Sequence, residues 1–314
     1  MLQVGVQSSS WFDREDPDGS FRFIKECGFD AVDFNIDNFV SVSDLKKVAL
    51  QSFFDQTEEE ILAYFKPFKE AAERYGVRFS QMHAPFPVYD EERPDFNDYM
   101  MMVVEKCLAV CAYVGCPAIV VHPKNHSDKQ KEIEYNMIIY RRLMPAARKY
   151  RVKICLENLF ITTRSRNVEG ACSNVDEAIH YIDTLNAEAG EELFGFCLDI
   201  GHANILGRNP RWYIDRLGSR LTILHLHDND GKQDLHMMPY SYANNWGKDQ
   251  VCDWEGFLHG LADVNYQGTL SFETFRVQTA FPKPLWGASL RLIAEIGRYW
   301  ANRIEEIRAE EAGM

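Results

Sequence analysis

The segment from 221 to 236, LTILHLHDNDGKQDLH, begins as an apolar run and ends in side chains that bind metal ions. His225 and His227 stand two residues apart, which places both on one face of a strand. Asp234 and His236 follow in the next loop. Imidazole and carboxylate groups together suit Zn²⁺, Mn²⁺ or a similar divalent ion. The simpler alternative is a polar turn after a core strand.

Five other apolar runs of the chain end in the same kinds of residue. In chain order, these residues are His83, His122, Glu157, Asp199, His202 and Glu273. One histidine at a strand end is more often a hydrogen-bonded core residue than a ligand. Glu157 and Glu273 need another explanation, because a buried carboxylate requires a partner and neither strand end supplies a lysine or arginine. Several such ends together indicate a metal site.

Eight apolar runs of strand type, each followed by a stretch of helical type, must position these residues. The runs lie at 2–6, 30–36, 78–86, 116–123, 152–158, 193–203, 221–230 and 268–275. This alternation predicts an α/β fold, a single (β/α)8 TIM barrel in one domain over 1–314. The carboxyl ends of barrel strands meet at one rim, where barrel enzymes keep their active sites. The long loops at 37–57, 86–96, 160–172 and 231–252 belong to that rim and are expected to carry function.

Composition narrows the classes of function. The net charge of −13 opposes a surface for duplex nucleic acid, which needs basic residues. The sequence contains no run of 18 apolar residues, so no membrane span is predicted. The N-terminus lacks the pattern of a signal peptide, so we expect a cytoplasmic protein. The eight cysteines include no CxxC pair and are predicted to be buried, reduced thiols.

The motifs HAPF, VVHP, CLEN, CLDIGHAN, HLHDNDGKQDLH, DW and SFET, in this order, resemble the xylose isomerase-like TIM barrel superfamily. That superfamily holds sugar isomerases and epimerases, inosose dehydratases and the endonuclease IV DNA-repair enzymes. The resemblance is close over 80–275. It implies a metal-dependent enzyme that isomerises or epimerises a sugar or sugar phosphate. The expected partner is thus a small sugar or polyol, with no nucleic acid and no membrane.

The resemblance to ketose epimerases implies one divalent ion, zinc, manganese or magnesium. Its ligands would be Glu157, Asp199, His225 and Glu273. One glutamate would also remove a carbon-bound proton, the other would return a proton from the opposite face and invert that centre, and His202 would contact the substrate. His227 would support the site or contact substrate, and Trp246 and Trp254 are expected as aromatic walls.

The resemblance to endonuclease IV implies instead three zinc ions that cleave abasic DNA. The nine matching positions all carry the required residue type: His83, His122, Glu157, Asp199, His202, His225, Asp234, His236 and Glu273. Three departures oppose this alternative: the net charge, the missing Tyr-Leu wedge in HAPFPVYD, and the missing GEG turn after Asp234 and His236.

The missing GEG turn is a departure from the epimerases as well. The arginine expected six residues after the metal histidine of epimerases is Gly231 here, which leaves the substrate open. An inosose-type dehydratase, with the same metal and a base, is a further alternative. A long C-terminal helix at 287–311 is expected to close the barrel or to join copies in a homo-oligomer, with a solvated cap as the alternative.

Overall fold

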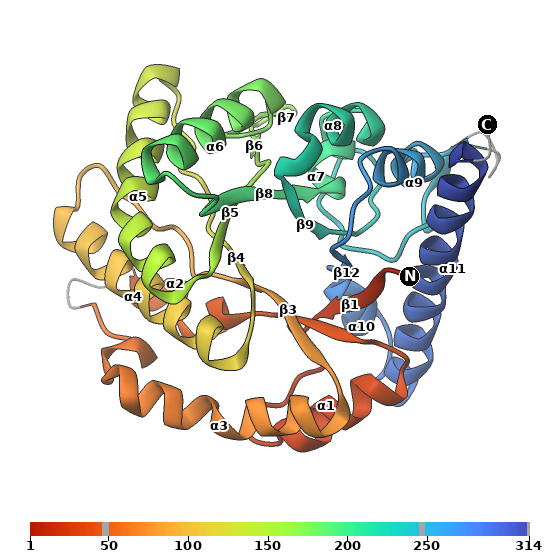
Figure 1. Ribbon diagram of the computed structural model, residues 1–314, viewed down its shortest axis with the longest axis horizontal. Helices are drawn as coiled ribbons and strands as arrows, with labels where there is room; N and C mark the ends of the chain where they lie inside the picture. Colours follow the sequence, from red (N-terminus) through yellow and green to blue (C-terminus); the bar gives the residue numbers. More distant parts are fainter. Residues whose placement is uncertain (46–49, 245–248, 313–314) are drawn as a thin grey trace.

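The computed structural model describes residues 1–45, 50–244 and 249–312, and eight parallel strands form its centre (Figure 1). Their neighbours follow the order β12-β1-β2-β3-β4-β5-β8-β9. The strands are β1 (Gln3–Gln7), β2 (Ala31–Phe34), β3 (Arg78–His83), β4 (Ala118–Val120), β5 (Lys153–Glu157), β8 (Phe194–Asp199), β9 (Leu221–His225) and β12 (Thr269–Phe272).

The sheet closes between its first and last members, β12 and β9. Leu226, just after β9, forms a parallel bridge with Phe272 of β12. The Leu226 amide donates to the Ser271 carbonyl at 2.9 Å, and the Glu273 amide donates to the Leu226 carbonyl at 3.0 Å. These bonds complete the ring, so the predicted (β/α)8 TIM barrel is confirmed.

Helices surround the barrel and cover its outer face (Figure 1). They are α1 (Pro17–Glu26), α2 (Val42–Leu45), α3 (Glu58–Tyr75), α4 (Pro94–Val114), α5 (Lys129–Tyr150), α6 (Val175–Ala189), α7 (Ile200–Ile205), α8 (Pro210–Leu217), α9 (Trp254–Asp263), α10 (Phe275–Ala280) and α11 (Trp286–Ala312). Short 3-10 turns lie at Ile36–Phe39, Phe53–Asp55, Gly218–Arg220 and Lys283–Leu285. The predicted C-terminal helix at 287–311 corresponds to α11. Local signals set the helix ends: Thr57 and Glu60 form a capping box before α3, and Gly76 ends it with a left-handed backbone.

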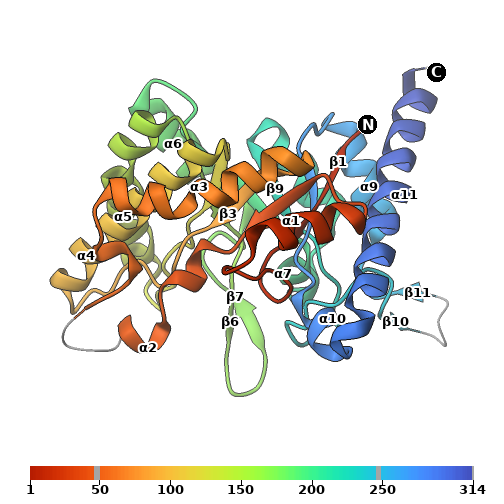
Figure 2. The same ribbon diagram turned by 90° about the horizontal axis from the view of Figure 1, so that it is seen from below.

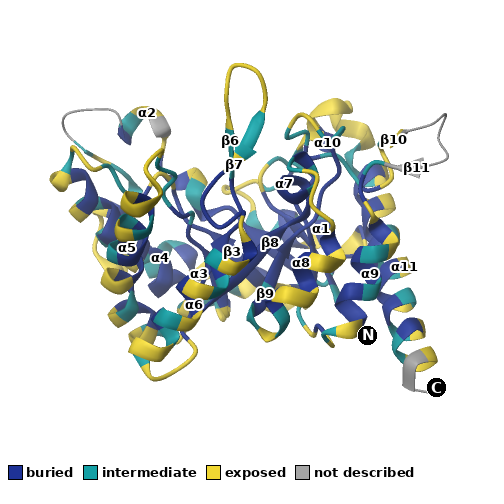
Figure 3. Cartoon of the chain, turned by 90° about the horizontal axis from the view of Figure 1, so that it is seen from above, coloured by how far each residue is buried: buried dark blue, intermediate teal, exposed yellow. Residues whose placement is uncertain are grey.

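Alternation along each strand separates the core from the barrel interior. On β5, Ile154 and Leu156 belong to the main hydrophobic core, whereas Cys155 packs inside the barrel and Glu157 stands at its upper end. The barrel strands are mostly buried, with exposed or half-buried residues chiefly at their starts, as at Arg78, Gln3 and Lys153 (Figure 3). All eight cysteines are free and buried, which confirms the prediction of reduced, buried thiols. Within the described ranges, no helix is long and apolar enough to cross a membrane.

Additional elements follow the carboxyl ends of the strands. The loop after β5 forms an antiparallel hairpin of β6 (Phe160–Thr162) and β7 (Asn167–Glu169), which projects far beyond the barrel (Figure 2). A second hairpin pairs β10 (Ala243–Asn244) with β11 (Asp249–Gln250). Both hairpins lie at the end of the molecule that also holds α2 and α10 (Figure 2). The long loops thus surround the rim at which the candidate ligands are expected.

Helix α11 packs so closely on β1 that one of its residues must be glycine. A Cβ atom on Gly297 would overlap Val4 and would lie 2.9 Å from the Phe272 ring. We expect Gly297→Ala to reduce the free energy of unfolding by about 1–3 kcal/mol, because overpacking outweighs the gain in helix propensity. Gly287→Ala in the same helix is the matched control, since its Cβ would lie 3.2 Å from the flexible Arg291 guanidinium and in ordinary contact, 3.5 Å, with the Phe23 ring. Chemical denaturation measures both; equal stability of the two variants contradicts the prediction.

Candidate metal centre

Four adjacent or nearby strand ends bring together the residues that the sequence predicts as a metal set. Glu157 ends β5, Asp199 ends β8, His225 ends β9, and Glu273 directly follows β12. Each is buried, with at most 8% of its surface exposed. The two-residue period of a strand turns these positions into the barrel, while their neighbours Leu156, Leu198, Leu224 and Phe272 join the outer core.

The three carboxylates converge on a single nitrogen of His225. Its Nδ1 atom lies 3.2 Å from Glu157 Oε1, 3.3 Å from Glu273 Oε2 and 3.9 Å from Asp199 Oδ2. Tetrahedral bonds of about 2.1 Å place ligand atoms about 3.4 Å apart, so these spacings match a metal-ligand set. Gln7 fixes one side of the set by donating from Nε2 to Glu273 Oε1 at 2.6 Å.

The charge of this group calls for a cation. Among the described residues that line the adjoining cavity there is no lysine or arginine, although Asp37, Glu157, Asp234 and Glu273 are all present. Glu157 is 1% exposed, and the nitrogens beside its Oε2 atom belong to the imidazoles of His122 and His83 rather than to a lysine or arginine. Buried carboxylates are stable only when paired or bound to metal. The donor set of one nitrogen and several oxygens therefore fits a divalent ion such as Zn²⁺ or Mn²⁺.

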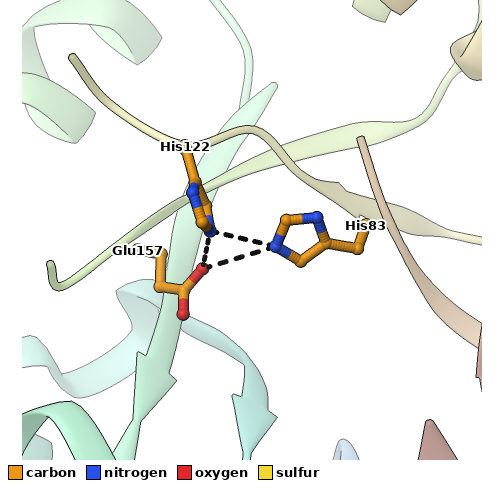
Figure 4. Close-up of side chains that lie close together, drawn as sticks. All are labelled: His83, His122 and Glu157. Carbon is orange, nitrogen blue, oxygen red and sulfur yellow. Dashed lines mark hydrogen bonds and ion pairs between the residues drawn. The ribbon is translucent and has the colours of Figure 1, made fainter. Parts of the chain in front are cut away.

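A second group forms around the other oxygen of Glu157 (Figure 4). His122 Nε2 lies 2.8 Å from Glu157 Oε2 and 2.9 Å from His83 Nε2. Burial lowers the pKa of His83 to about 3, with a further decrease from the neighbouring His122, so His83 is neutral and keeps a lone pair for a metal. Glu157 thus links this group to the His225 group.

A third group includes the residues of the loop after β9. His236 Nε2 lies 2.9 Å from Asp234 Oδ2, and His202 Nε2 lies 3.7 Å from the same oxygen. His227 connects this group to the first, because its Nε2 lies 3.1 Å from Asp199 Oδ1 and 3.6 Å from Asp234 Oδ1.

The local fold fixes two members of the third group. Asp199 caps α7 by accepting from the His202 amide at 2.7 Å, which holds His202 above the strand end. The ring of His227 fills the space beside Gly201, where any Cβ atom would overlap it.

The three groups open on a cavity of about 450 Å³. Three phenylalanines supply its aromatic walls: Phe86, Phe160 and Phe275. His227, expected to support the site or contact substrate, does not line the cavity.

The prediction of Trp254 as a wall residue is wrong. Trp254 begins α9, is 2% exposed, and packs in the core with its ring centroid 4.9 Å from that of Trp300. The cap from Asp253 starts the helix there and directs the indole inward. Trp246 lies outside the described residues.

Sequence reasoning missed polar residues from β1 and β2. Asp33 is completely buried beneath the site, and Asp37 lines the cavity with Asn35 and Gln7. Burial raises the pKa of Asp37 to about 6 despite a hydrogen bond from Asn35. The signal was present in DAVDFNID, where polar residues alternate with apolar ones on a strand otherwise typical of a core.

The two glutamates of the first group differ in protonation. Burial raises the pKa of Glu273 to about 8, and the charges of Asp199 and Glu157 add to this effect against the opposing charge of His225. Burial also opposes ionisation of Glu157, but His122 and His225 outweigh it and hold its pKa well below the usual range. At neutral pH without metal, Glu157 is ionised and Glu273 carries a proton.

Comparison with known proteins identifies the family. The family model described as "Xylose isomerase-like TIM barrel" matches residues 21–296, and the chain belongs to this family. The protein y4fM of Sinorhizobium fredii is 23% identical over 283 residues, which cover 84% of this chain and 82% of y4fM.

Solved structures share the fold. A "D-tagatose 3-epimerase-like protein" has a TM-score of 0.67 at 20% identity, covering 99% of this chain and all of that one. The 3-keto-D-glucoside 4-epimerase YcjR of E. coli also has a TM-score of 0.67, at 17% identity, covering 93% of this chain and 99% of YcjR.

The raised pKa of Glu273 predicts how the stability of the metal-free protein depends on pH. Its folded pKa is about 8 against an ordinary 4.5, so its contribution is fully present below the lower value and is lost as pH rises through the upper one. We expect Glu273→Gln, which cannot ionise, to gain stability relative to wild type between about pH 5 and about pH 9. Urea unfolding with chelator measures this. The exposed Glu192→Gln is the control, and parallel pH curves for wild type and Glu273→Gln contradict the prediction.

Proposed function

We propose that this protein is a divalent-metal-dependent isomerase or epimerase of a sugar or sugar phosphate. One observation carries the proposal: two buried glutamates face one histidine nitrogen beside a cavity that is open to solvent. Two proteins of similar fold, a D-tagatose 3-epimerase-like protein and the 3-keto-D-glucoside 4-epimerase YcjR, support the same class.

The cavity suits a small polar molecule. Its volume of about 450 Å³ lies within the range of about 300–1,000 Å³ typical of ligand sites. Polar groups such as Gln7, Asn35 and Asn125 offer hydrogen bonds to hydroxyl groups, while Phe86 and Phe160 offer apolar faces to carbon atoms. A sugar has both kinds of surface.

Proton transfer requires one group that accepts and one that donates. Glu157 would remove the proton from a carbon next to a carbonyl group, and Glu273 would return one to the opposite face of the same carbon. In the barrel, β8 and β9 separate the strands of the two glutamates, so the glutamates approach a substrate from different sides and the returned proton inverts the carbon.

The remaining residues hold the metal and the substrate. Glu157, Asp199, His225 and Glu273 would hold a divalent ion, which polarises adjacent carbonyl and hydroxyl oxygens and makes the carbon-bound proton acidic. Burial opposes the charged form of His202, but Asp199 and Asp234 raise its pKa to about 10. A charged His202 lining the cavity would donate a hydrogen bond to a substrate oxygen.

A trinuclear phosphodiesterase of the endonuclease IV type is the second candidate. One observation favours it: the nine matching residues lie together at one end of the barrel, grouped around Glu157, Asp199 and Asp234. The net charge of −13 and the absence of lysine and arginine from the described cavity lining oppose it, because a phosphodiester backbone needs basic contacts.

Substitution of either glutamate tests the proton transfer. We expect Glu157→Gln and Glu273→Gln each to lower turnover about 10²–10⁴-fold, because each loses a general acid or base. Exchange of a carbon-bound hydrogen for deuterium in a panel of ketoses and their phosphates, followed by NMR in heavy water, measures the loss and identifies the substrate. The exposed Glu192→Gln should keep wild-type activity. Retained exchange in both site variants contradicts the proposal, and release of water from the substrate indicates a dehydratase.

Metal stoichiometry separates the two candidates. We expect about one tightly bound divalent ion per chain when the protein is purified without chelator, because one set contains three carboxylates around a histidine. Elemental analysis measures it. Close to three zinc ions per chain, with cleavage of abasic DNA, would favour the phosphodiesterase instead.

A further inference from the structure

His225 has a second buried carboxylate on its far side. Asp33 lies on β2, is 0% exposed, and places its Oδ2 atom 3.3 Å from His225 Nε2. In the barrel, β1 and β12 separate β2 from β9, so this contact crosses the interior below the metal set. Asp33 does not line the cavity and is beyond the reach of a substrate there.

The two nitrogens of His225 therefore have different partners. Nδ1 faces Glu157 and Glu273, whereas Nε2 faces Asp33. A nitrogen binds a cation only with a free lone pair, so a neutral His225 that binds through Nδ1 must carry its proton on Nε2. In a buried site that N–H group needs an acceptor. Nε2 has no other hydrogen-bond partner among the described residues, and Asp33 Oδ2 is the acceptor within reach.

A third residue fixes Asp33 in this position. Gln81 on β3 donates from Nε2 to Asp33 Oδ2 at 3.0 Å and to the Leu224 carbonyl at 3.1 Å. The second bond connects Asp33 to the backbone of β9 immediately before His225. Gln81 is also 0% exposed, so water does not compete for these bonds.

We propose that Asp33 is a positioning residue that holds His225 in the tautomer and orientation needed to bind a divalent metal through Nδ1, and that Gln81 fixes Asp33. This inference rests on the metal centre of the proposed function. Carboxylates that accept from a metal-binding histidine fix its tautomer and raise its basicity, and their loss weakens metal affinity about 10–100-fold.

Asp33→Asn in the full chain tests the inference. Asparagine keeps an oxygen for Gln81 but removes the negative charge, so the His225 Nε2–H group loses its charge-assisted bond and Nδ1 becomes a weaker metal ligand. Titration of the metal-free protein with Co²⁺ should show affinity about 10–100-fold below wild type and a changed visible absorption spectrum. The stability of the metal-free protein should stay equal or rise, because a buried carboxylate has been removed.

Two further variants keep the test decisive. Gln81→Met retains the Asp33 carboxylate but removes the hydrogen bond that fixes it, so we expect a smaller loss of Co²⁺ affinity than in Asp33→Asn. If Asp33→Asn does not fold, Gln81→Met provides the test. Ser271→Ala, at a buried residue whose hydroxyl group makes no hydrogen bond, should bind Co²⁺ as wild type does. Wild-type affinity and spectrum in Asp33→Asn or, where that does not fold, in Gln81→Met overturn the inference. If wild type itself takes up no Co²⁺, the proposed metal centre fails, and the inference fails with it.

Discussion

The structure depends on how it compensates negative charge at the upper end of the barrel. Glu157, Asp199 and Glu273 surround one nitrogen of His225, and all four residues are buried. The described residues of the adjoining cavity supply no lysine or arginine, so the neighbouring histidines and the divalent cation that we propose would supply the positive charge. The alternating strands, the caps and the long loops all keep these groups together.

Much of this arrangement follows from the sequence because strands obey a two-residue period. Apolar residues such as Leu224 and Leu226 must face the helices, so His225 must face the interior. Contacts between distant strands do not follow in this way. Asp33 could be placed inside a barrel by its alternation, but its contact with His225 depends on the order and register of the closed sheet. Trp254 was predicted to line the cavity, and this is wrong because the sequence does not fix which way the first indole of a helix points. The cap from Asp253 directs that indole into the core.

The nine candidate ligands fit both the sugar isomerase or epimerase and the phosphodiesterase considered above. The residues between these ligands would distinguish the two activities. His227 lies within 3.6 Å of Asp199 and Asp234 and stacks on the ring of His236 at 4.0 Å. An N–H group of the imidazole in this position can donate to carboxylate oxygens that a cation would otherwise use. The number of metal ions is thus a property of the whole histidine network, and a match of ligand types alone does not define it.

The closure of the barrel lies directly beneath this network. Leu226 and Glu273 exchange a backbone hydrogen bond at the junction of β9 and β12, and each is next to or part of the metal set. A metal bound by His225 and Glu273, as proposed, would connect the two ends of the sheet. Metal binding would then stabilise the docking of the last strand–helix unit, so depletion of metal would loosen the C-terminal part of the chain before the remainder.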